Sequence, residues 1–230
     1  YAKIALLPEF LLAENGQRQV RLRAGLSYDD TDRDASEVSP IADVTWSNGD
    51  DSYYLSFSQA SQVSGYTAIG GATGGLFASN PDLEREVSRN AEIGATFQRS
   101  DWSLKAAAFF REDADLVDWT YSFGATSARS AKNVDIDTYG VEVIGSKRFG
   151  QLELLASATA LDKDEDYGDP TVDASFYALN YATLRLTAAA VWRATEQLQF
   201  RVDNEYRDQA DNVLREGDDS ALFTHLGVYY

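Results

Sequence analysis

The chain has 230 residues, a formal net charge of -17 and a mean hydropathy of -0.36. This acidity argues against binding to nucleic-acid phosphates, and no run of about 18 apolar residues is present to form a transmembrane helix. Cysteine is absent, which excludes disulfides and thiol chemistry. Methionine is absent too, so we expect a processed or excised piece of a longer protein.

Apolar residues recur with a period of two along the chain. In the segment 182–193, Leu184, Leu186 and Trp192 share one parity, whereas Arg185 and Arg193 share the other. This alternation predicts a strand with one apolar and one polar face. We expect about eleven such strands, near residues 4–12, 20–28, 38–46, 53–57, 91–97, 102–110, 139–143, 152–158, 184–192, 198–206 and 222–230.

Charged residues almost never fall on the apolar parity. A charge facing lipid at the bilayer midplane costs roughly 2–4 kcal/mol, so this one-sidedness is typical of a β-barrel with an apolar outside and a wet inside. A soluble β-sandwich, which also alternates apolar and polar positions, is the structural alternative.

Short and long connections alternate between the expected strands. Tight turns fall at 14–17, 48–51, 99–101, 148–151 and 194–197, and longer links near 29–36, 59–86, 118–135, 163–178 and 208–220. Asn48-Gly49 is typical of a hairpin turn. Outer-membrane barrels place short turns in the periplasm and longer loops outside. We therefore predict an all-β chain that forms part of an antiparallel transmembrane β-barrel.

Residues 80–94, NPDLEREVSRNAEIG, are similar to the N-P-x-L-x-P-E-x-S-x-x-x-E-x-G segment of TonB-dependent outer-membrane receptors. Arg85 stands where the family has proline. Residues 137–142, DTYGVE, resemble a later G-x-E strand of that family. The resemblance covers most of residues 18–230. It implies that residues 1–230 are a single region, the C-terminal part and roughly half of a 22-stranded barrel, from which the family's plug domain is absent.

The resemblance also implies a function. Such receptors take up a scarce ligand, namely a siderophore, cobalamin, haem or carbohydrate, with energy supplied by TonB, and they are not enzymes. The implied partners are outer-membrane lipid and lipopolysaccharide, the plug and the rest of the barrel, and the TonB complex. A passive channel of about twelve strands is the alternative. An enzyme barrel is more remote, and His225, the single histidine, would be its candidate acid or base.

Aromatic residues in the long links are the candidate ligand contacts, because aromatic rings supply large contact areas. They are Tyr66, Trp119, Tyr121 and Tyr177. The glycine-rich segment 70–75 lacks the lysine and the strand–helix context of a phosphate-binding loop, so we expect an external loop there.

The acidic link near residue 163 leaves two readings open. Asp162, Asp164 and Asp166 have the spacing of the first half of a calcium loop, but Tyr167 stands where that loop needs glycine. The segment is thus either a solvated acidic loop or a calcium site, and no other cofactor is expected.

The charged parity of the strands is expected to line the barrel interior. There it would contact a plug, form ladders of paired charge between strands, or do both. The inward residues are Arg21, Arg23, Glu92, Arg111, Glu142, Arg185, Arg201, Asp203 and Glu205.

Overall fold

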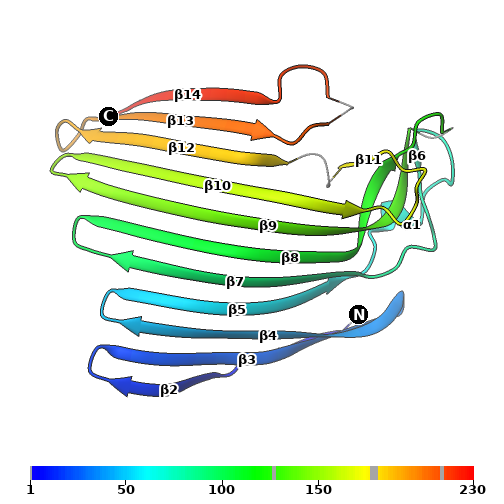
Figure 1. Cartoon of the computed structure of the whole chain (residues 1–230), viewed down its shortest axis with the longest axis horizontal. Helices are drawn as coiled ribbons and strands as arrows, with labels where there is room; N and C mark the ends of the chain where they lie inside the picture. The colour runs from blue at the N-terminus through cyan, green and yellow to red at the C-terminus, as the bar shows by residue number, and fades with distance from the viewer. Residues whose placement is uncertain (1, 126–127, 177–180, 213–214) are drawn as a thin grey trace.

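The computed structural model describes residues 2–125, 128–176, 181–212 and 215–230. Most of these residues belong to one sheet, which runs from β1 and β2 at one edge to β14 at the other (Figure 1). Its long strands are β1 (Ala2–Leu6), β2 (Glu9–Asn15), β3 (Arg18–Thr31), β4 (Asp34–Asn48), β5 (Asp51–Gln62), β7 (Glu86–Gln98), β8 (Trp102–Tyr121), β9 (Arg129–Phe149), β10 (Leu152–Asp166), β12 (Ala182–Arg193), β13 (Gln199–Gln209) and β14 (Ser220–Tyr229). Short elements are α1 (Tyr66–Ile69), β6 (Phe77–Ala78) and β11 (Ala174–Ser175).

The long strands follow one another in space in the order of the sequence, joined as antiparallel hairpins. β1 and β2 both pair with β3, so together they occupy one position, and the path through the sheet has eleven positions among the described residues. The predicted strand number and antiparallel order are therefore confirmed. No helix in the described part of the chain is long and apolar enough to cross a membrane.

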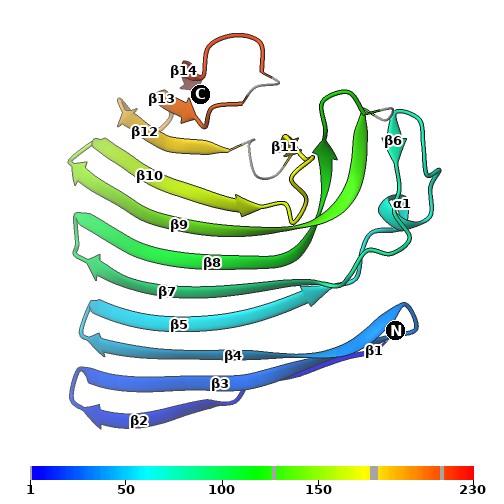
Figure 2. The same ribbon diagram turned by 45° about the vertical axis from the view of Figure 1, so that its right-hand side comes forward.

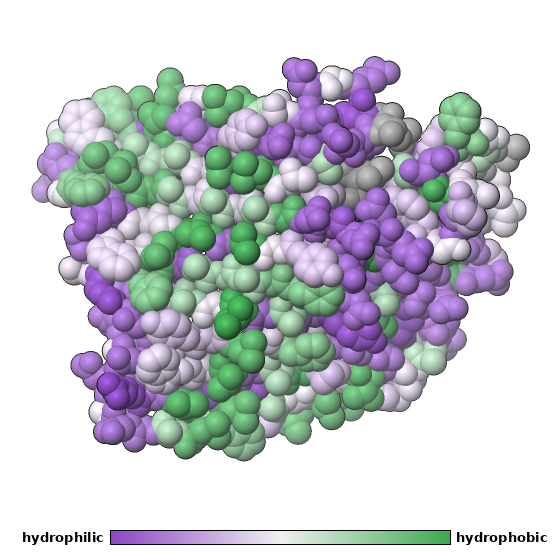
Figure 3. All heavy atoms as spheres, in the orientation of Figure 1, coloured by the Kyte–Doolittle hydropathy of each residue, from purple (hydrophilic) through white to green (hydrophobic). Residues whose placement is uncertain are grey.

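One face of the sheet, which we call the apolar face, carries the residues of the apolar parity. Leu55 pairs with Val44 on one side and with Ile93 on the other. The same row of paired residues contains Leu22, Val44, Leu55, Ile93, Ala108, Val141, Ala160 and Leu184. Figure 3 shows apolar side chains gathered over the middle of the strands, with hydrophilic residues towards the ends. The register thus places the apolar sets of separate strands on one continuous surface.

The first strand departs from the expected pattern at Leu12. A bulge between Leu11 and Ala13 shifts the register, and Ala13 rather than Leu12 stands opposite Val20. Leu12 is therefore the extra residue of this strand and has no partner position on β3, so the alternation expected over residues 4–12 is interrupted there.

The strands are longer than predicted at the end with the long links. β8 and β9 continue to Tyr121 and Arg129, so the expected link 118–135 is mostly paired strand, and the expected link 29–36 is a turn of two residues between β3 and β4. In these extensions charged side chains occur on both faces, for example at Glu112 and Asp113. A search for alternation misses such strands, although their backbone ladder continues.

Two connections flank the tip of the β8–β9 hairpin at its opposite edges (Figure 2). The β5–β7 connection brings β6 to the free edge of β9, with the Phe77 ring centroid 5.3 Å from that of Trp119. The β10–β12 connection brings β11 to the free edge of β8, and its Tyr167 packs on the cluster of Val134 and Ile136. The tip is therefore enclosed on both sides and holds the buried apolar cluster of the chain's described part.

We expect Gly140→Val to destabilise the sheet by about 1–3 kcal/mol through overpacking. A Cβ at Gly140 would lie 2.2 Å from the Phe109 ring of β8, so the ring or the backbone must move. The urea midpoint of the purified protein measures the effect. Gly145→Val on the same strand is the control, because its nearest neighbours lie at 3.6 Å. Partial recovery in Phe109→Ala/Gly140→Val would confirm the cause, and equal midpoints for the two glycine variants would contradict it.

Candidate functional site

The face opposite the apolar face, which we call the ionic face, carries the candidate charged residues. Arg23 pairs with Asp43, whose next partner across the sheet is Ser56 and then Glu92. The register places on this same face all the candidates, which are Arg21, Arg23, Glu92, Arg111, Glu142, Arg185, Arg201, Asp203 and Glu205. Their contact with a plug stays a prediction.

Most acids on the ionic face are neutralised by arginine. Arg185 holds Glu205 with two N–O distances of 3.0 Å, and Arg201 holds Asp203 on its own strand. Arg23 Nε lies 2.7 Å from Asp43 Oδ2. These ion pairs form the ladders of paired charge that were one of the two roles considered for the charged parity.

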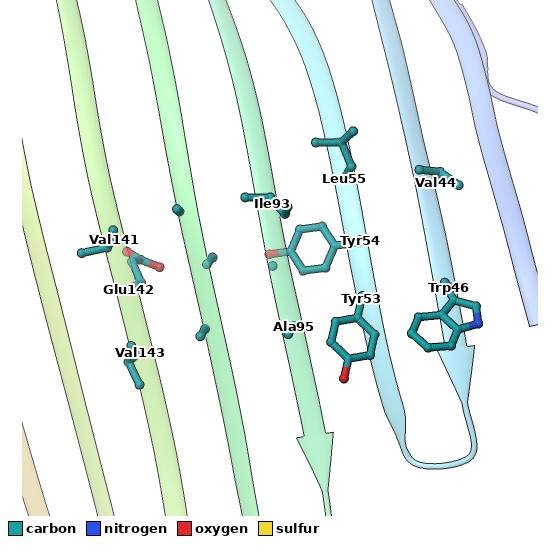
Figure 4. A pocket seen from close by; sticks show the side chains of 14 residues that line it. Val44, Trp46, Tyr53, Tyr54, Leu55, Ile93, Ala95, Val141, Glu142 and Val143 are labelled. Carbon is teal, nitrogen blue, oxygen red and sulfur yellow. The ribbon is translucent and has the colours of Figure 1, made fainter. Parts of the chain in front are cut away.

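Glu92 and Glu142 differ from those acids. Among the described residues, neither carboxylate has a basic nitrogen within 4.0 Å. The Tyr54 hydroxyl donates a hydrogen bond to Glu92, and Glu142 lies close enough to act on Tyr54 electrostatically. Figure 4 shows Tyr54 of β5 reaching across β7 on the side from which Glu142 of β9 also projects. The centre of the ionic face therefore has two carboxylates without an ion-pair partner, which we call the carboxylate pair.

The glycines of both sequence motifs have a packing role beside this pair. A Cβ at Gly94 would lie 2.4 Å from the Tyr54 ring, and one at Gly140 would meet Phe109. The missing side chains leave room for an aromatic ring from the neighbouring strand, which covers the glycine backbone. Each motif thus combines an acid on the ionic face with a glycine whose missing side chain leaves space for an aromatic ring.

A second polar site lies at the strand ends beyond the apolar rows, at a level where Arg89 and Glu112 form an ion pair across β7 and β8. Glu86, Asp113 and Arg111 line a hollow of about 170 Å³ there. Burial and the nearby Asp113 carboxylate raise the pKa of Glu86 to about 7, although the Val117 amide opposes this by donating to it. Glu86 therefore titrates near neutral pH.

Sequence reasoning missed the buried ion pair of Arg85 and Asp29. Arg85 Nη1 lies 2.9 Å from Asp29 Oδ1 and 3.2 Å from Ser61 Oγ, and both charged residues are nearly inaccessible to solvent. The pair ties β3 to the start of β7, across the place where β4 and β5 cease to pair beyond Ile41 and Ser58. In the sequence, the one signal of this ion pair was that Arg85 stands where the family has proline.

The predicted aromatic ligand contacts occupy different settings. Tyr66 is 75% exposed in α1. Trp119 instead packs on Phe77, and Tyr121 lies beneath Arg129, with Cζ 5.5 Å from the ring centroid. Tyr177 lies outside the described residues. Of the three that are described, Tyr66 alone presents most of its ring to solvent.

The acidic triplet lies on a strand rather than in a loop. Asp162, Asp164 and Asp166 belong to β10 and pair with Tyr139, Asp137 and Asp135. Alternate residues of an extended strand are about 6–7 Å apart and their side chains are parallel, so the three carboxylates do not converge as in a calcium loop. In the described part of the chain, no group of three or more acids or histidines could hold a metal ion. The structure therefore corrects the expected loop, because residues 162–166 belong to a strand. The geometry of their carboxylates does not support a calcium site.

His225 lies on the edge strand β14, with Nδ1 3.8 Å from Asp203 Oδ2. Asp203 is already engaged by Arg201. The imidazole thus lies beside an existing ion pair on the ionic face.

A sequence profile of the family described as TonB dependent receptor-like, beta-barrel, matches residues 13–230. The chain belongs to this family of receptor barrels. It is a family of transporters and receptors rather than of enzymes. No curated protein sequence matches the chain.

Solved structures share the fold at low sequence identity. The siderophore receptor PirA from Pseudomonas aeruginosa is 14% identical to this chain, with a TM-score of 0.71. The match covers 99% of this chain and 39% of the PirA chain. The FrpB iron transporter from Neisseria meningitidis (F5-1 variant) is 19% identical with a TM-score of 0.66, over 98% of this chain and 37% of its own. The copper transporter OprC is 14% identical with a TM-score of 0.63, over 98% and 38%. The receptor barrel thus spans well under half the length of these structures.

The pKa of Glu86 generates a test of pH dependence. Because its folded value of about 7 exceeds the ordinary 4.5, the folded state holds more protons between these values than the unfolded chain does. Its contribution to stability is fully present below about pH 4.5 and is lost as the pH rises through 7. We expect Glu86→Gln to flatten this part of the profile of urea midpoint against pH. The exposed Glu84→Gln is the control, and a wild-type profile in Glu86→Gln would contradict the assignment.

Proposed function

We propose that the receptor barrel is part of an outer-membrane receptor that takes up a scarce small molecule with energy from TonB. The apolar face would lie against lipid, and the ionic face would line the lumen. Support comes from the continuous apolar rows that cross the sheet, since lipid excludes unpaired charge and unsatisfied backbone groups. The single observation that carries the proposal is this two-faced register in a chain of the receptor family.

The short turns would face the periplasm and the enclosed β8–β9 tip the outside. Trp46 stacks on Tyr53 beside the turn between β4 and β5, at 5.1 Å, and Trp192 stacks on Phe200 beside the turn between β12 and β13, at 5.5 Å. Aromatic rings at this level are typical of a membrane interface. The opposite orientation would place the charged extensions of β8 and β9 in the periplasm.

The carboxylate pair would receive cationic groups of the plug. Glu92 and Glu142 would face the lumen, and among the described residues no basic nitrogen lies within 4.0 Å of either carboxylate. Glu142 is exposed and Glu92 is half-buried, so both carboxylates remain accessible to a positive partner, which favours their charged form. A plug that sits against them would bring the neutralising charges. Tyr54 fixes Glu92 for this contact through its hydrogen bond.

The ligand class is tested by uptake. The first probes are radiolabelled ferric siderophores and copper, because the structural neighbours are a siderophore receptor, an iron transporter and a copper transporter. We expect accumulation of one probe in cells that express the complete protein, and loss of that accumulation when TonB is deleted. Accumulation that persists without TonB, with conductance in planar bilayers, would favour the passive channel.

Replacing the carboxylate pair is expected to impair uptake specifically. Glu92→Gln/Glu142→Gln removes two charge-assisted hydrogen bonds to the plug, and we expect uptake to fall at least about tenfold. The change should leave the amount of protein in the outer membrane unchanged. Glu205→Gln, which alters a carboxylate already held by Arg185, is the matched control. If the control lowers uptake as much as the double variant does, the special role of the pair is wrong.

A further inference from the structure

The ladder between β4 and β5 ends before the two strands do. Its last pair is Ile41 with Ser58, whereas beyond this pair β4 continues along β3 and β5 continues along β7. The sheet therefore divides at this level, and Figure 2 shows the two hairpins separating. We call the unpaired stretch, residues 34–40 of β4 against residues 59–62 of β5, the seam.

Beyond the last pair, residues 26–40 form the outer part of the β3–β4 hairpin, which we call the flap. The part of β4 that it contains, residues 34–40, extends about 23 Å at 3.3 Å per residue. β1 pairs with the other side of the flap, up to Ala2 with Asp30. Along the seam, no backbone hydrogen bond joins the flap to the rest of the described chain. The flap is thus hinged at the level of Ile41, where the ladder resumes.

Side chains close the seam in place of a ladder. The Gln59 amide nitrogen donates to Glu37 Oε1 at 2.8 Å and to the Val38 carbonyl at 3.3 Å. Arg89 Nε orients this amide by donating to its oxygen at 3.2 Å. A ladder separates only when many bonds break together, whereas these contacts are few and lie on separate side chains. The seam can therefore open without disrupting a strand.

A buried ion pair is the central contact across the seam. Arg85, just before β7, reaches Asp29 in the flap, and the two side chains are only 8% and 10% exposed. Near the tip, Arg33 also donates to the Ser64 carbonyl. In the part of the chain that the structure describes, Arg85 Nε and Nη2 are buried without a hydrogen-bond acceptor. Such donors gain hydration when the contact separates, so the pair holds the flap closed against a cost that opening removes.

The segment that carries Arg85 is fixed on its own side. The Glu84 amide donates to Asn133 Oδ1 at 2.8 Å, and Asn133 Nδ2 donates to the Asp115 carbonyl at 2.6 Å. The same connection also contains β6, which pairs with β9. These contacts bind the segment to the β8–β9 tip, so the flap is the side of the seam that moves.

The seam leads into a hollow on the ionic face. The hollow has a volume of about 480 Å³ and begins at Ile41 and Ser58, the last pair of the ladder. Its two charged members, Arg23 and Asp43, are already paired with each other. Hydroxyl side chains make up much of the remaining lining, namely Thr45, Ser52, Tyr54, Ser56 and Ser58. Such a surface exchanges hydrogen bonds with a polar solute without a charge that would hold it in place.

We propose that the flap swings about the level of Ile41, that Arg85 latches it closed through Asp29, and that its release widens the entrance to the hydroxyl-lined hollow for the incoming ligand. The inference rests on the outward placement of this end of the strands given under the proposed function. It assigns a moving part to the wall of the barrel, whereas the candidate aromatic contacts lie in other connections.

Distances across the seam test the latch. The 230 residues contain no cysteine, so spin labels at Asp32→Cys in the flap and Asp82→Cys opposite it are the only ones in this chain. Both positions are exposed. In the complete protein, with any cysteine elsewhere replaced, double electron–electron resonance should give one dominant short distance. We expect the population at longer distance to rise at least about tenfold in Arg85→Met, since Asp29 then stays buried without its partner.

Two further variants separate the latch from general destabilisation. Arg85→Met/Asp29→Leu replaces both charges by apolar side chains, and we expect it to restore the short distance. Arg207→Met is the matched control, because it removes an arginine from an ion pair with Glu205 on β13, away from the seam. A wild-type distribution in Arg85→Met would overturn the latch, and so would an equal rise in Arg207→Met.

A milder variant keeps the test decisive if Arg85→Met does not fold. Gln59→Met removes the other contact across the seam at a half-buried site and leaves no buried charge. We expect the population at longer distance to rise about threefold, as for the loss of one hydrogen bond. An unchanged distribution would overturn the inference that side chains hold the seam closed.

Locking the seam tests the role of the flap in uptake. Glu37→Cys/Gln59→Cys replaces two side chains that meet across it, and dithiobis(maleimidoethane) links the thiols until a reductant cleaves the linker. The probe is the radiolabelled ferric siderophore or copper that wild-type cells accumulate. We expect the linked protein to take up the probe at least about fivefold more slowly, and to recover on reduction, because a gating motion is blocked.

The matched control for the link lies on a continuous ladder. Ser157→Cys/Thr187→Cys replaces two hydroxyls that lie 2.7 Å apart across β10 and β12, and its link should leave uptake unchanged. Uptake that is unaffected by the link across the seam would overturn the role of the flap. If wild-type cells accumulate neither probe, the proposed function fails instead, and the distance measurements still decide whether the flap opens.

Discussion

Satisfied backbone hydrogen bonding, combined with one face whose central rows carry no charge, is the constraint on which this sheet depends. A strand in hydrocarbon has no water to pair with its amides and carbonyls, so each must pair with its neighbour. The side chains then have only two directions, and the chain assigns apolar residues to one and ions to the other. The row from Leu22 to Leu184 shows that this assignment is coherent across eight strands. A slip of one residue in any pair would reverse it.

The two ends of the strands obey different rules. At the short-turn end, stacked rings and cations lie next to tight hairpins. At the other end the strands leave the apolar rows and both faces become polar, so alternation no longer guides the chain. Order there comes from the two connections that pair with opposite edges of the β8–β9 tip, and from contacts such as that of Lys132 with Asp169. The Lys132 ammonium and the Thr171 donors hold the pKa of Asp169 below its ordinary range, so this contact persists in mild acid.

The ionic face is a patterned surface rather than a uniform one. Arginine-paired acids on β12 and β13 form self-contained ladders, which contribute little to binding because their charge is already used. The carboxylate pair between them and β5 is different, since Tyr54 orients Glu92 without neutralising it. The glycines beside it exist for steric reasons, as their missing side chains admit Tyr54 and Phe109. Each sequence motif thus supplies one carboxylate for a charged contact and one glycine for a packing contact.

The sequence by itself determined the all-β class, the number and order of the strands, the two faces and the tight turns, because a period of two and turn residues are local signals. It also revealed the family through residues 80–94. Only the tertiary structure decided which charges remain unpaired, since pairing depends on neighbours such as Arg185 and Glu205, twenty residues apart. The bulge at Leu11, the extensions of β8 and β9, the burial of Arg85 against Asp29 and the placing of the Asp162 triplet on a strand were likewise beyond sequence reasoning. Each depends on register or on contacts between distant segments, which no local pattern encodes.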